Sequence, residues 1–323
     1  MDGSRMKPTV SIVINNYNYG RFIGDAIRSA LSQTYSEVEI IVVDDGSTDE
    51  SREVIASFGN AIMPCLQANG GQTSALNAGL SASKGDWVCL LDSDDMFLPE
   101  KVEKIVALSA TYPTAGMIAH DLRYCSEDGQ PIEYAQPYVD RERLVDDRSL
   151  VRRQGSLSVS LPATSGLCFR REMIERLLPM PTDVRVGTDN YMKWVLLSLA
   201  PVLVSPATLA VQRIHGKNLM TTVVEGGGNE ARVLFAKNSA VLTYQMKQQH
   251  PHLRKLAWKQ YGRLLYGLRS AASVESRAIE RDIRRNYSAA EYHPESMFYV
   301  GAAYAKALAE DMLKKIRTPS KQA

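Results

Sequence analysis

Three aspartates stand at the end of one apolar run. Asp92, Asp94 and Asp95 follow a run that begins at Trp87, and only Ser93 separates them. An apolar run of this length is typical of a strand buried on both faces of a parallel sheet. Acids at its end would lie at the rim, where ligands bind in open α/β sheets. Because closely spaced aspartates repel one another, the sequence favours a divalent-metal site for a phosphate-bearing ligand.

Polar residues also end two earlier apolar runs. Residues 15 to 17 follow the run from Thr9 to Ile14, and Asp44 and Asp45 follow the run from Val38 to Val43. If the three runs are neighbouring strands, their polar ends converge on one crevice. Each cluster alone is weak evidence, since Asp-Gly-Ser is common turn chemistry and acids often open helices.

Helical patterns alternate with these strands. Helices are expected at Phe22 to Leu31, after a capping box of Ser47 and Glu50, through residues 75 to 80, and from Pro99 at a first helical position to Leu108. Further strands are expected at Ile62 to Leu66 and Met117 to His120. This alternation predicts a mainly parallel α/β sheet with right-handed crossovers.

The second half of the chain is less regular. Residues 121 to 163 lose the alternation and predict a hairpin and loops. Order returns with an apolar segment at 166 to 169, helices at 172 to 177 and 189 to 199, and two strands at 202 to 204 and 209 to 214. After residue 226 only helices are expected, one with an apolar stripe from Leu253 to Leu268.

Charge is unevenly distributed along the 323 residues. The chain has 38 basic and 36 acidic side chains, a net charge of +2 that indicates no particular partner and gives no reason to expect nucleic acid. Residues 1 to 221 hold 21 Lys and Arg against 27 Asp and Glu, a balance of −6, and residues 222 to 323 hold 17 against 9, a balance of +8. The basic tail could contact an anionic membrane surface. We favour the alternative, that its apolar stripe packs on the catalytic domain or a second subunit.

Cysteines and apolar segments indicate the compartment. Cys65, Cys89, Cys125 and Cys168 are scattered without a CxxC pair, which favours reduced thiols. Residues 1 to 5 lack the apolar core of a signal peptide, and the apolar stretch at 194 to 204 is too short to span a membrane. We predict a cytoplasmic protein, soluble or peripheral to the inner face of a membrane.

Three segments together resemble a known family. The runs from Ser11 to Asn18, from Ile40 to Asp49 and from Leu91 to Asp95 are similar in order, spacing and strand context to family 2 of the inverting glycosyltransferases. The resemblance covers residues 8 to 220. It implies a GT-A fold, a Rossmann-like mixed sheet, in a catalytic domain at 1–221 with a nucleotide-binding half (1–110) and an acceptor half (111–221). A helical region at 222–323 follows.

The resemblance assigns residues to a nucleotide-sugar donor. It places Asn15 and Tyr17 in the nucleobase pocket, and Asp45 on the base through a hydrogen bond. The alternative for Tyr17 is a ring that covers the sheet edge. Asp92 and Ser93 would also contact the nucleotide.

The same resemblance implies a metal ion. Residues 92 to 94 match the DXD motif, in which carboxylates hold Mg²⁺ or Mn²⁺ against the donor diphosphate, and both ions prefer hard oxygen ligands. An EF-hand is excluded, because Phe97 stands where that loop needs glycine. His215 would complete the metal shell together with Asp92 and Asp94, and Arg213 and Lys217 would offset phosphate charge. The alternative for His215 is an ordinary loop histidine.

On the acceptor side, inversion requires a base that takes the proton of the attacking hydroxyl. Asp189 occupies the family's place for this base, although Thr188 stands where many relatives have glutamate. The alternative is that Thr188 or Asp189 caps the following helix. Thr164, Ser165 and Gly166 precede a strand that faces the acceptor in the family, so these small residues would make room for a sugar.

These expectations define one predicted activity. The chain lacks the Gln-x-x-Arg-Trp segment and the membrane helices of polymerising relatives, so we expect transfer of a single hexosyl or N-acetylhexosaminyl unit. The resemblance favours a UDP-sugar donor and a saccharide or lipid-linked acceptor. Two alternatives are a nucleotide-sugar-binding protein without turnover, suggested by Thr188, and a nucleotidyltransferase, which would need a basic phosphate loop near the first strand. An oligomer is compatible with the sequence.

Overall fold

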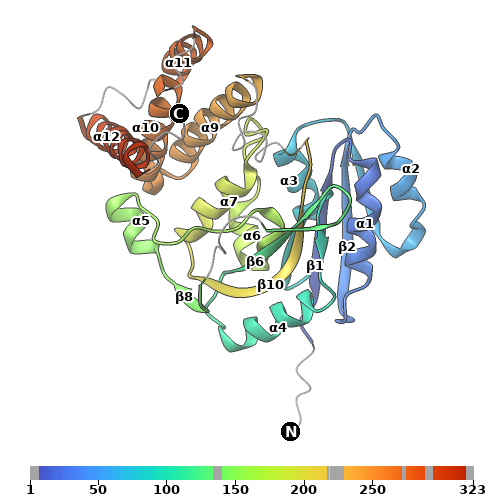
Figure 1. The fold of residues 1–323 in the computed structure, drawn as a ribbon. Coiled ribbons are helices and arrows are strands. Elements are labelled where there is room, and N and C mark those ends of the chain that lie inside the picture. Colours follow the sequence, from blue (N-terminus) through green and yellow to red (C-terminus); the bar gives the residue numbers. More distant parts are fainter. Residues whose placement is uncertain are drawn as a thin grey trace. The chain divides into compact units, whose positions relative to one another are not determined.

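The computed structural model describes residues 7–133, 140–216, 218, 229–270, 274–287 and 294–317. The chain divides into two compact units (Figure 1). The first unit comprises Met1–Arg148 and Ser158–Asn218, and the second comprises Ser149–Leu157 and Leu219–Ala323. Each unit has its own packed interior, and each is described separately below.

The first unit is built on one mixed sheet. Within the described residues this sheet has ten strands, in the order β3-β2-β1-β4-β9-β6-β10-β5, with β7 beside β6 and β8 beside β10. The strands are β1 (Val10–Asn16), β2 (Val38–Asp45), β3 (Met63–Gln67), β4 (Trp87–Asp92), β5 (Met96–Phe97), β6 (Met117–Ser126), β7 (Pro131–Ile132), β8 (Arg143–Val145), β9 (Leu167–Arg170) and β10 (Val202–Ile214). The predicted mixed, mainly parallel α/β architecture is confirmed.

Strand direction divides the sheet. Strands β1 to β4 are parallel to one another, and β6 is parallel to β10. Between these two groups β9 runs antiparallel to both β4 and β6. The carboxyl ends of β1, β2 and β4 therefore lie along one edge of the sheet, as the three polar clusters predict.

Helices pack on both faces of this sheet (Figure 1). They are α1 (Gly20–Leu31), α2 (Ser51–Ala56), α3 (Gln72–Ala82), α4 (Lys101–Thr111), α6 (Arg171–Leu177) and α7 (Thr188–Leu197), with short 3₁₀ turns η1 (Gly59–Ala61) and η2 (Thr164–Gly166). Helix α5 (Arg148–Gln154) lies almost wholly in the second unit.

The alternating side chains of β1 explain both helix layers. Ile12 and Ile14 share one buried cluster with Ile27 of α1 and Ile105 of α4. On the opposite face, a Cβ atom on Gly79 of α3 would come within 2.5 Å of Val13 Cγ1. Because successive strand residues point to opposite faces, the continuous apolar run lets β1 bury both of them.

Three local expectations were wrong. The two strands expected after residue 201 are one strand, β10, which continues through irregular pairing between Ser205 and Ala210. Helix α4 begins at Lys101, so Pro99 precedes it. Helix α2 has no side-chain cap, because Ser47 Oγ instead accepts a hydrogen bond from the backbone N–H of Asn18.

The second unit is helical throughout its described residues. Its helices are α9 (Asn229–Gln249), the 3₁₀ turn η3 (Pro251–Leu253), α10 (Arg254–Ser270), α11 (Val274–Tyr287) and α12 (Pro294–Arg317). The stripe predicted on α10 is buried within this unit, where Leu265 and Leu268 pack with Ala240 of α9 and Ile283 of α11. No helix in the described ranges is both long and apolar enough to cross a membrane.

Candidate active site

The three polar clusters meet at the carboxyl ends of adjacent strands. The register of the sheet places Asn15 beside Asp92 of β4 and Asn16 beside Asp44 of β2. Alternation along β1 sends the two asparagine side chains to opposite sides of the sheet. Two polar networks follow, one around Asp44 and one around Asp92.

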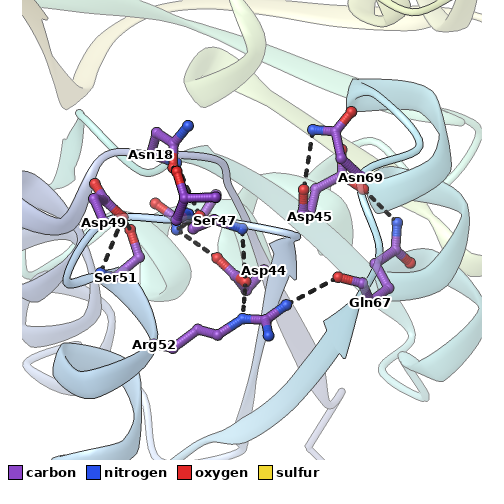
Figure 2. Close-up of polar contacts among 11 residues, drawn as sticks. Asn18, Asp44, Asp45, Ser47, Asp49, Ser51, Arg52, Gln67 and Asn69 are labelled. Carbon is purple, nitrogen blue, oxygen red and sulfur yellow. Dashed lines mark hydrogen bonds and ion pairs between the residues drawn. The ribbon is translucent and has the colours of Figure 1, made fainter.

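Asp44 is the centre of the first network (Figure 2). Its carboxylate accepts hydrogen bonds from Asn16 Nδ2 (3.0 Å), Ser47 N (3.2 Å) and Arg52 Nε (2.8 Å). Burial opposes ionisation of Asp44, but the hydrogen bonds from Ser47, Arg52 and Asn16 hold its pKa below the ordinary value. This aspartate therefore fixes the turn after β2, where Gly46 adopts a φ of 78°.

Asp45 faces the loop after β3. Its carboxylate accepts hydrogen bonds from Gln67 Nε2 (2.6 Å) and from the backbone N–H groups of Gly70 (2.9 Å) and Gly71 (2.7 Å), and its carbonyl accepts one from Asn69 Nδ2 (Figure 2). The predicted base-binding residue thus holds the glycine loop that leads into α3.

Asp92 is half-buried and Asp95 is buried, and the two acids repel the carboxylates beside them. Burial, followed by the charges of Asp94 and Asp189, raises the pKa of Asp92 to about 7, against smaller opposing effects from Thr164 and Asn15. Burial and the charges of Asp94 and Asp92 also raise the pKa of Asp95 well above its usual range. The site therefore concentrates negative charge that a cation would stabilise.

The 3₁₀ turn η2 forms hydrogen bonds with both Asp92 and Asp95. Ser165 Oγ donates to Asp95 Oδ2 (2.6 Å) and accepts a hydrogen bond from the backbone N–H of Asp92 (3.1 Å). Asp95 Oδ1 accepts a hydrogen bond from the backbone N–H of Arg213 on β10 (2.9 Å). Asp95, just after β4, therefore links this strand to η2 and β10 through its hydrogen bonds.

His215, directly after β10, contacts the acid motif, which is the group of Asp92, Asp94 and Asp95 after β4. Its Nε2 lies 3.0 Å from Asp94 Oδ2, and Asn218 Nδ2 donates to the same oxygen at 3.1 Å. The imidazole ring packs against Tyr19, with ring centroids 5.5 Å apart, and against Phe22, at 4.9 Å. His215 is thus a buried neighbour of the DXD carboxylates.

These residues fit a divalent cation that is shared with a ligand. No three His, Cys, Asp or Glu side chains within the described ranges come close enough to hold a metal by themselves. Asp94 and His215, however, bring a carboxylate and an imidazole together, beside the high-pKa carboxyl of Asp92. Because Mg²⁺ and Mn²⁺ commonly take remaining ligands from phosphates and water, this set suits an ion completed by a diphosphate.

Asp189 lies in the first turn of α7. Lys193 Nζ donates to its Oδ2 at 2.7 Å, and the Asp189 side chain is only 17% exposed. The helix N-cap is Gly187, so neither Thr188 nor Asp189 caps it, and that alternative was wrong. Instead, Thr188 Oγ1 lies 2.6 Å from Thr73 Oγ1 of α3.

Three more residues were predicted to bind the donor: Tyr17, Arg213 and Lys217. The Tyr17 ring is 46% exposed at the end of β1. Arg213 forms an ion pair with Asp25 (2.9 Å), and its guanidinium lies 4.5 Å from the centroid of Phe22. Lys217 falls outside the described residues.

The predicted acceptor-side residues and Ser93 are all buried. Thr164, Ser165 and Gly166 form η2, and Ser93 is 3% exposed. Thr164 and Ser165 hydrogen-bond to the acids. Their predicted role beside a sugar stays a prediction.

Sequence reasoning missed several neighbours of the acid motif. Tyr19 and Phe22 lie against His215, Asn218 hydrogen-bonds Asp94, and Lys101 hydrogen-bonds the backbone of Ser165. Phe22 reads as an ordinary apolar residue of an amphipathic helix, and Lys101 as a surface lysine. Among these residues, only Asn218 could have been recognised from the sequence, because it lies three residues after His215 in the same polar segment.

Comparison with known proteins identifies relatives of the chain. The sequence model described as "Glycosyl transferase family 2" matches residues 11–178. An uncharacterized glycosyltransferase of Nostoc sp. is 38% identical over 215 residues, which are 65% of this chain and 66%, just under two thirds, of that protein.

Two solved structures show the same fold. S. aureus TarS 1-349, in complex with UDP-GlcNAc, aligns with a TM-score of 0.60 and 14% identity over 86% of this chain and 80% of that one. The mannosyltransferase PcManGT from Pyrobaculum calidifontis, in complex with GDP-Man and Mn²⁺, aligns with a TM-score of 0.50 and 18% identity over 95% and 88%. Taken with the mixed sheet and the family match over more than half of its length, these findings show that the chain belongs to glycosyl transferase family 2 and has the GT-A fold.

Proposed function

We propose that this protein is a metal-dependent inverting glycosyltransferase, which moves one sugar from a nucleotide-sugar to a hydroxyl group of a saccharide or lipid-linked acceptor. The observation that carries the proposal is the group of acids at the carboxyl end of β4, where His215 Nε2 lies 3.0 Å from Asp94 Oδ2. Asp189 at the start of α7 is near enough for its charge to act on Asp92. A UDP-sugar is the proposed donor, as in the UDP-GlcNAc complex of the structural relative TarS.

Donor binding is assigned to the ends of β1, β2 and β4. The exposed Tyr17 ring is suited to stacking on a nucleobase, with Asn15 beside it. Asp45 is proposed to bind the base, which requires an exchange of its hydrogen bonds to the glycine loop. Arg213 and Lys217 are proposed to offset diphosphate charge.

Asp92, Asp94 and His215 are proposed to hold Mn²⁺ or Mg²⁺, and PcManGT is a structural relative that binds Mn²⁺. When bound, the ion would act as a Lewis acid that neutralises charge on the departing diphosphate. The chain itself contributes by holding the two proposed metal ligands, Asp94 and His215, in position. Asn218 and the Tyr19 and Phe22 rings hold His215 against Asp94, so the two ligands are arranged before the donor arrives.

Asp189 is proposed to be the catalytic base. Lys193 Nζ holds the carboxylate through Oδ2 at 2.7 Å, so Asp189 is oriented to accept the proton of the acceptor hydroxyl. At the position where many relatives have glutamate, the buried Thr188 hydroxyl instead lies 2.6 Å from Thr73 Oγ1.

Donor binding tests the proposal without knowledge of the acceptor. Calorimetry with UDP and Mn²⁺ should show binding that chelator removes and that Asp94→Ala weakens at least tenfold, while Asp86→Ala, on the opposite edge of the sheet, serves as the matched control. A screen of nucleotide-sugars with Mn²⁺ for slow hydrolysis then identifies the donor. UDP binding that neither chelator nor Asp94→Ala affects would exclude metal dependence.

A further inference from the structure

Lys101 is a charged residue in an unfavourable position. It is completely buried, although isolated lysine ammonium groups are expensive to remove from water. It is also the first residue of α4, where the partial positive charge of the helix N-terminus disfavours a cation. Residues that break local rules in this way are expected at functional sites.

The contacts of the ammonium group are specific. Lys101 Nζ donates to the carbonyl oxygen of Ser165 at 2.8 Å and lies 3.4 Å from the centroid of the Phe97 ring. Burial lowers the pKa of Lys101, while the neighbouring Cys168, Cys89 and Asp95 oppose that change. One side chain therefore ties α4 to β5 and to η2 from inside the core.

The carbonyl that Lys101 holds belongs to the residue that organises the acid motif. Ser165 Oγ donates to Asp95 and accepts the backbone N–H of Asp92, so one residue links Lys101 to both acids. The turn is closely packed at Gly166, where a Cβ atom would come within 2.6 Å of Pro162 and 2.9 Å of the His120 carbonyl oxygen.

We propose that Lys101 is a positioning residue, which holds η2 through the Ser165 carbonyl so that Ser165 fixes Asp92 and Asp95. This inference rests on the proposed function for its effect on metal and nucleotide. The hydrogen bonds themselves do not depend on that function. Partners of this kind, one step removed from the ligands, typically change metal affinity or activity by 10- to 100-fold when mutated.

The main variant is Lys101→Met, which keeps the length of the side chain but removes its charge and its donors. Ile105→Val is the matched control, because Ile105 is completely buried one turn later on α4, within the apolar cluster of the sheet. Both variants should lower the melting temperature. Only Lys101→Met should disturb the acid motif.

Two readouts separate positioning from general destabilisation. Hydrogen exchange at the amides of Asp92 and Arg213, which Ser165 and Asp95 protect, should accelerate at least tenfold in Lys101→Met relative to Ile105→Val. Calorimetry should show Mn²⁺ binding with UDP weakened about 10- to 100-fold in Lys101→Met and within about twofold of the parent in Ile105→Val.

The outcomes are distinguishable. If the parent protein shows no Mn²⁺-dependent UDP binding, the proposed function fails, while exchange at the two amides still decides the role of Lys101. If the parent binds and Lys101→Met matches Ile105→Val in both readouts, the inference about Lys101 is overturned. Lys101→Gln, which keeps an N–H donor, is the second variant. If neither Lys101→Met nor Lys101→Gln folds, the inference is also overturned, and Lys101 has a purely structural role.

Discussion

At the scale of single residues, the site is organised by its charges. Asp44 and Asp92 end the two strands that flank β1, yet their environments differ. Asp44 accepts three hydrogen bonds, one of them from the guanidinium of Arg52, whereas the hydrogen bonds of Asp92 are outweighed by burial and by the charges of Asp94 and Asp189. The first is a structural carboxylate, and the second is a candidate for ligand binding. Because both residues are aspartates, the residue type does not distinguish their roles, but the groups that surround each carboxylate do.

Asp189→Asn tests the base. The amide cannot take a proton, so the rate of sugar transfer should fall by about 10² to 10⁴, with UDP binding unchanged. The comparison is with Lys193→Met, which should lower the rate less because it removes only the partner of the base. Near-normal transfer by Asp189→Asn would refute the assignment, and lost UDP binding would make Asp189 a donor residue instead.

Asp92 predicts an unusual dependence of stability on pH. Its pKa in the folded protein, about 7, lies above the ordinary value of 3.8, so between these pH values the folded chain keeps a proton that the unfolded chain has lost. This contribution to stability is therefore full below pH 3.8, falls as the pH rises toward 7, and is absent above it.

Thermal unfolding in chelator measures this effect as the difference between the parent and Asp92→Asn. The difference isolates Asp92 from acids such as Asp44, whose lowered pKa acts in the opposite direction. We expect the parent to lose stability relative to the variant between pH 5 and 7, and Mn²⁺ with UDP to reverse that loss. A difference that does not vary with pH would contradict the raised pKa.

At the scale of elements, the segment before α7 is clamped to the start of α3. Gln72 N donates to the Arg185 carbonyl (3.0 Å), Thr73 Oγ1 donates to the Val184 carbonyl, and Thr73 and Thr188 join their hydroxyls. The same α3 terminus follows the glycine loop held by Asp45. The glycine loop and the segment that carries Asp189, the proposed base, are therefore joined through the start of α3.

Thr188→Val tests this clamp with little change in shape. Loss of the buried hydroxyl pair should lower the free energy of unfolding by about 1 kcal/mol, and transfer should slow because Asp189 is less well fixed. Thr188→Ser keeps the hydroxyl and should behave like the parent protein in chemical denaturation. Equal stability of the valine variant and the parent would show that the hydroxyl pair is not needed.

Sequence patterns predicted the elements better than their long-range partners. The apolar runs of β1, β2 and β4 are long and end in polar residues, so both the strands and the convergence of their ends were predictable. Strand β9 inserts between β4 and β6 after a long irregular segment, and no local pattern announces its antiparallel pairing. Likewise, the contact of Phe22 with His215 joins residues nearly two hundred positions apart.

At the scale of the whole molecule, the helical unit presents its own surface. On α12, Met297 and Phe298 are 64% and 68% exposed, and Lys255 and Lys259 of α10 lie 5.3 and 5.6 Å from the ring of the adjacent Tyr299. Exposed apolar side chains among basic ones, in a region with a balance of +8, are features of surfaces that contact anionic lipid. The sequence left this contact as the alternative to packing of the α10 stripe, whose Leu265 and Leu268 are buried within the helical unit.

Vesicle sedimentation tests this contact. The protein should bind vesicles that contain phosphatidylserine, and binding should fall with salt and by several-fold in Phe298→Ser, because the apolar anchor and the charge attraction both contribute. Leu144→Ser, an exposed apolar residue of the catalytic unit, is the control. Sedimentation that does not respond to anionic lipid would exclude the membrane contact.

The pairing of β1 has a consequence for how this chain can vary. Asn15 and Asn16 are adjacent, yet one faces the acid motif and the other holds the turn of Asp44. Adding a single residue between Val10 and Asn15 would move Asn15 into the place of Asn16 and Ile14 into the place of Asn15. Deleting one would move Asn16 into the place of Asn15 and Tyr17 into the place of Asn16, so either change would break the two networks even if every strand still formed. The spacing along this strand is thus as tightly constrained as the identity of its residues.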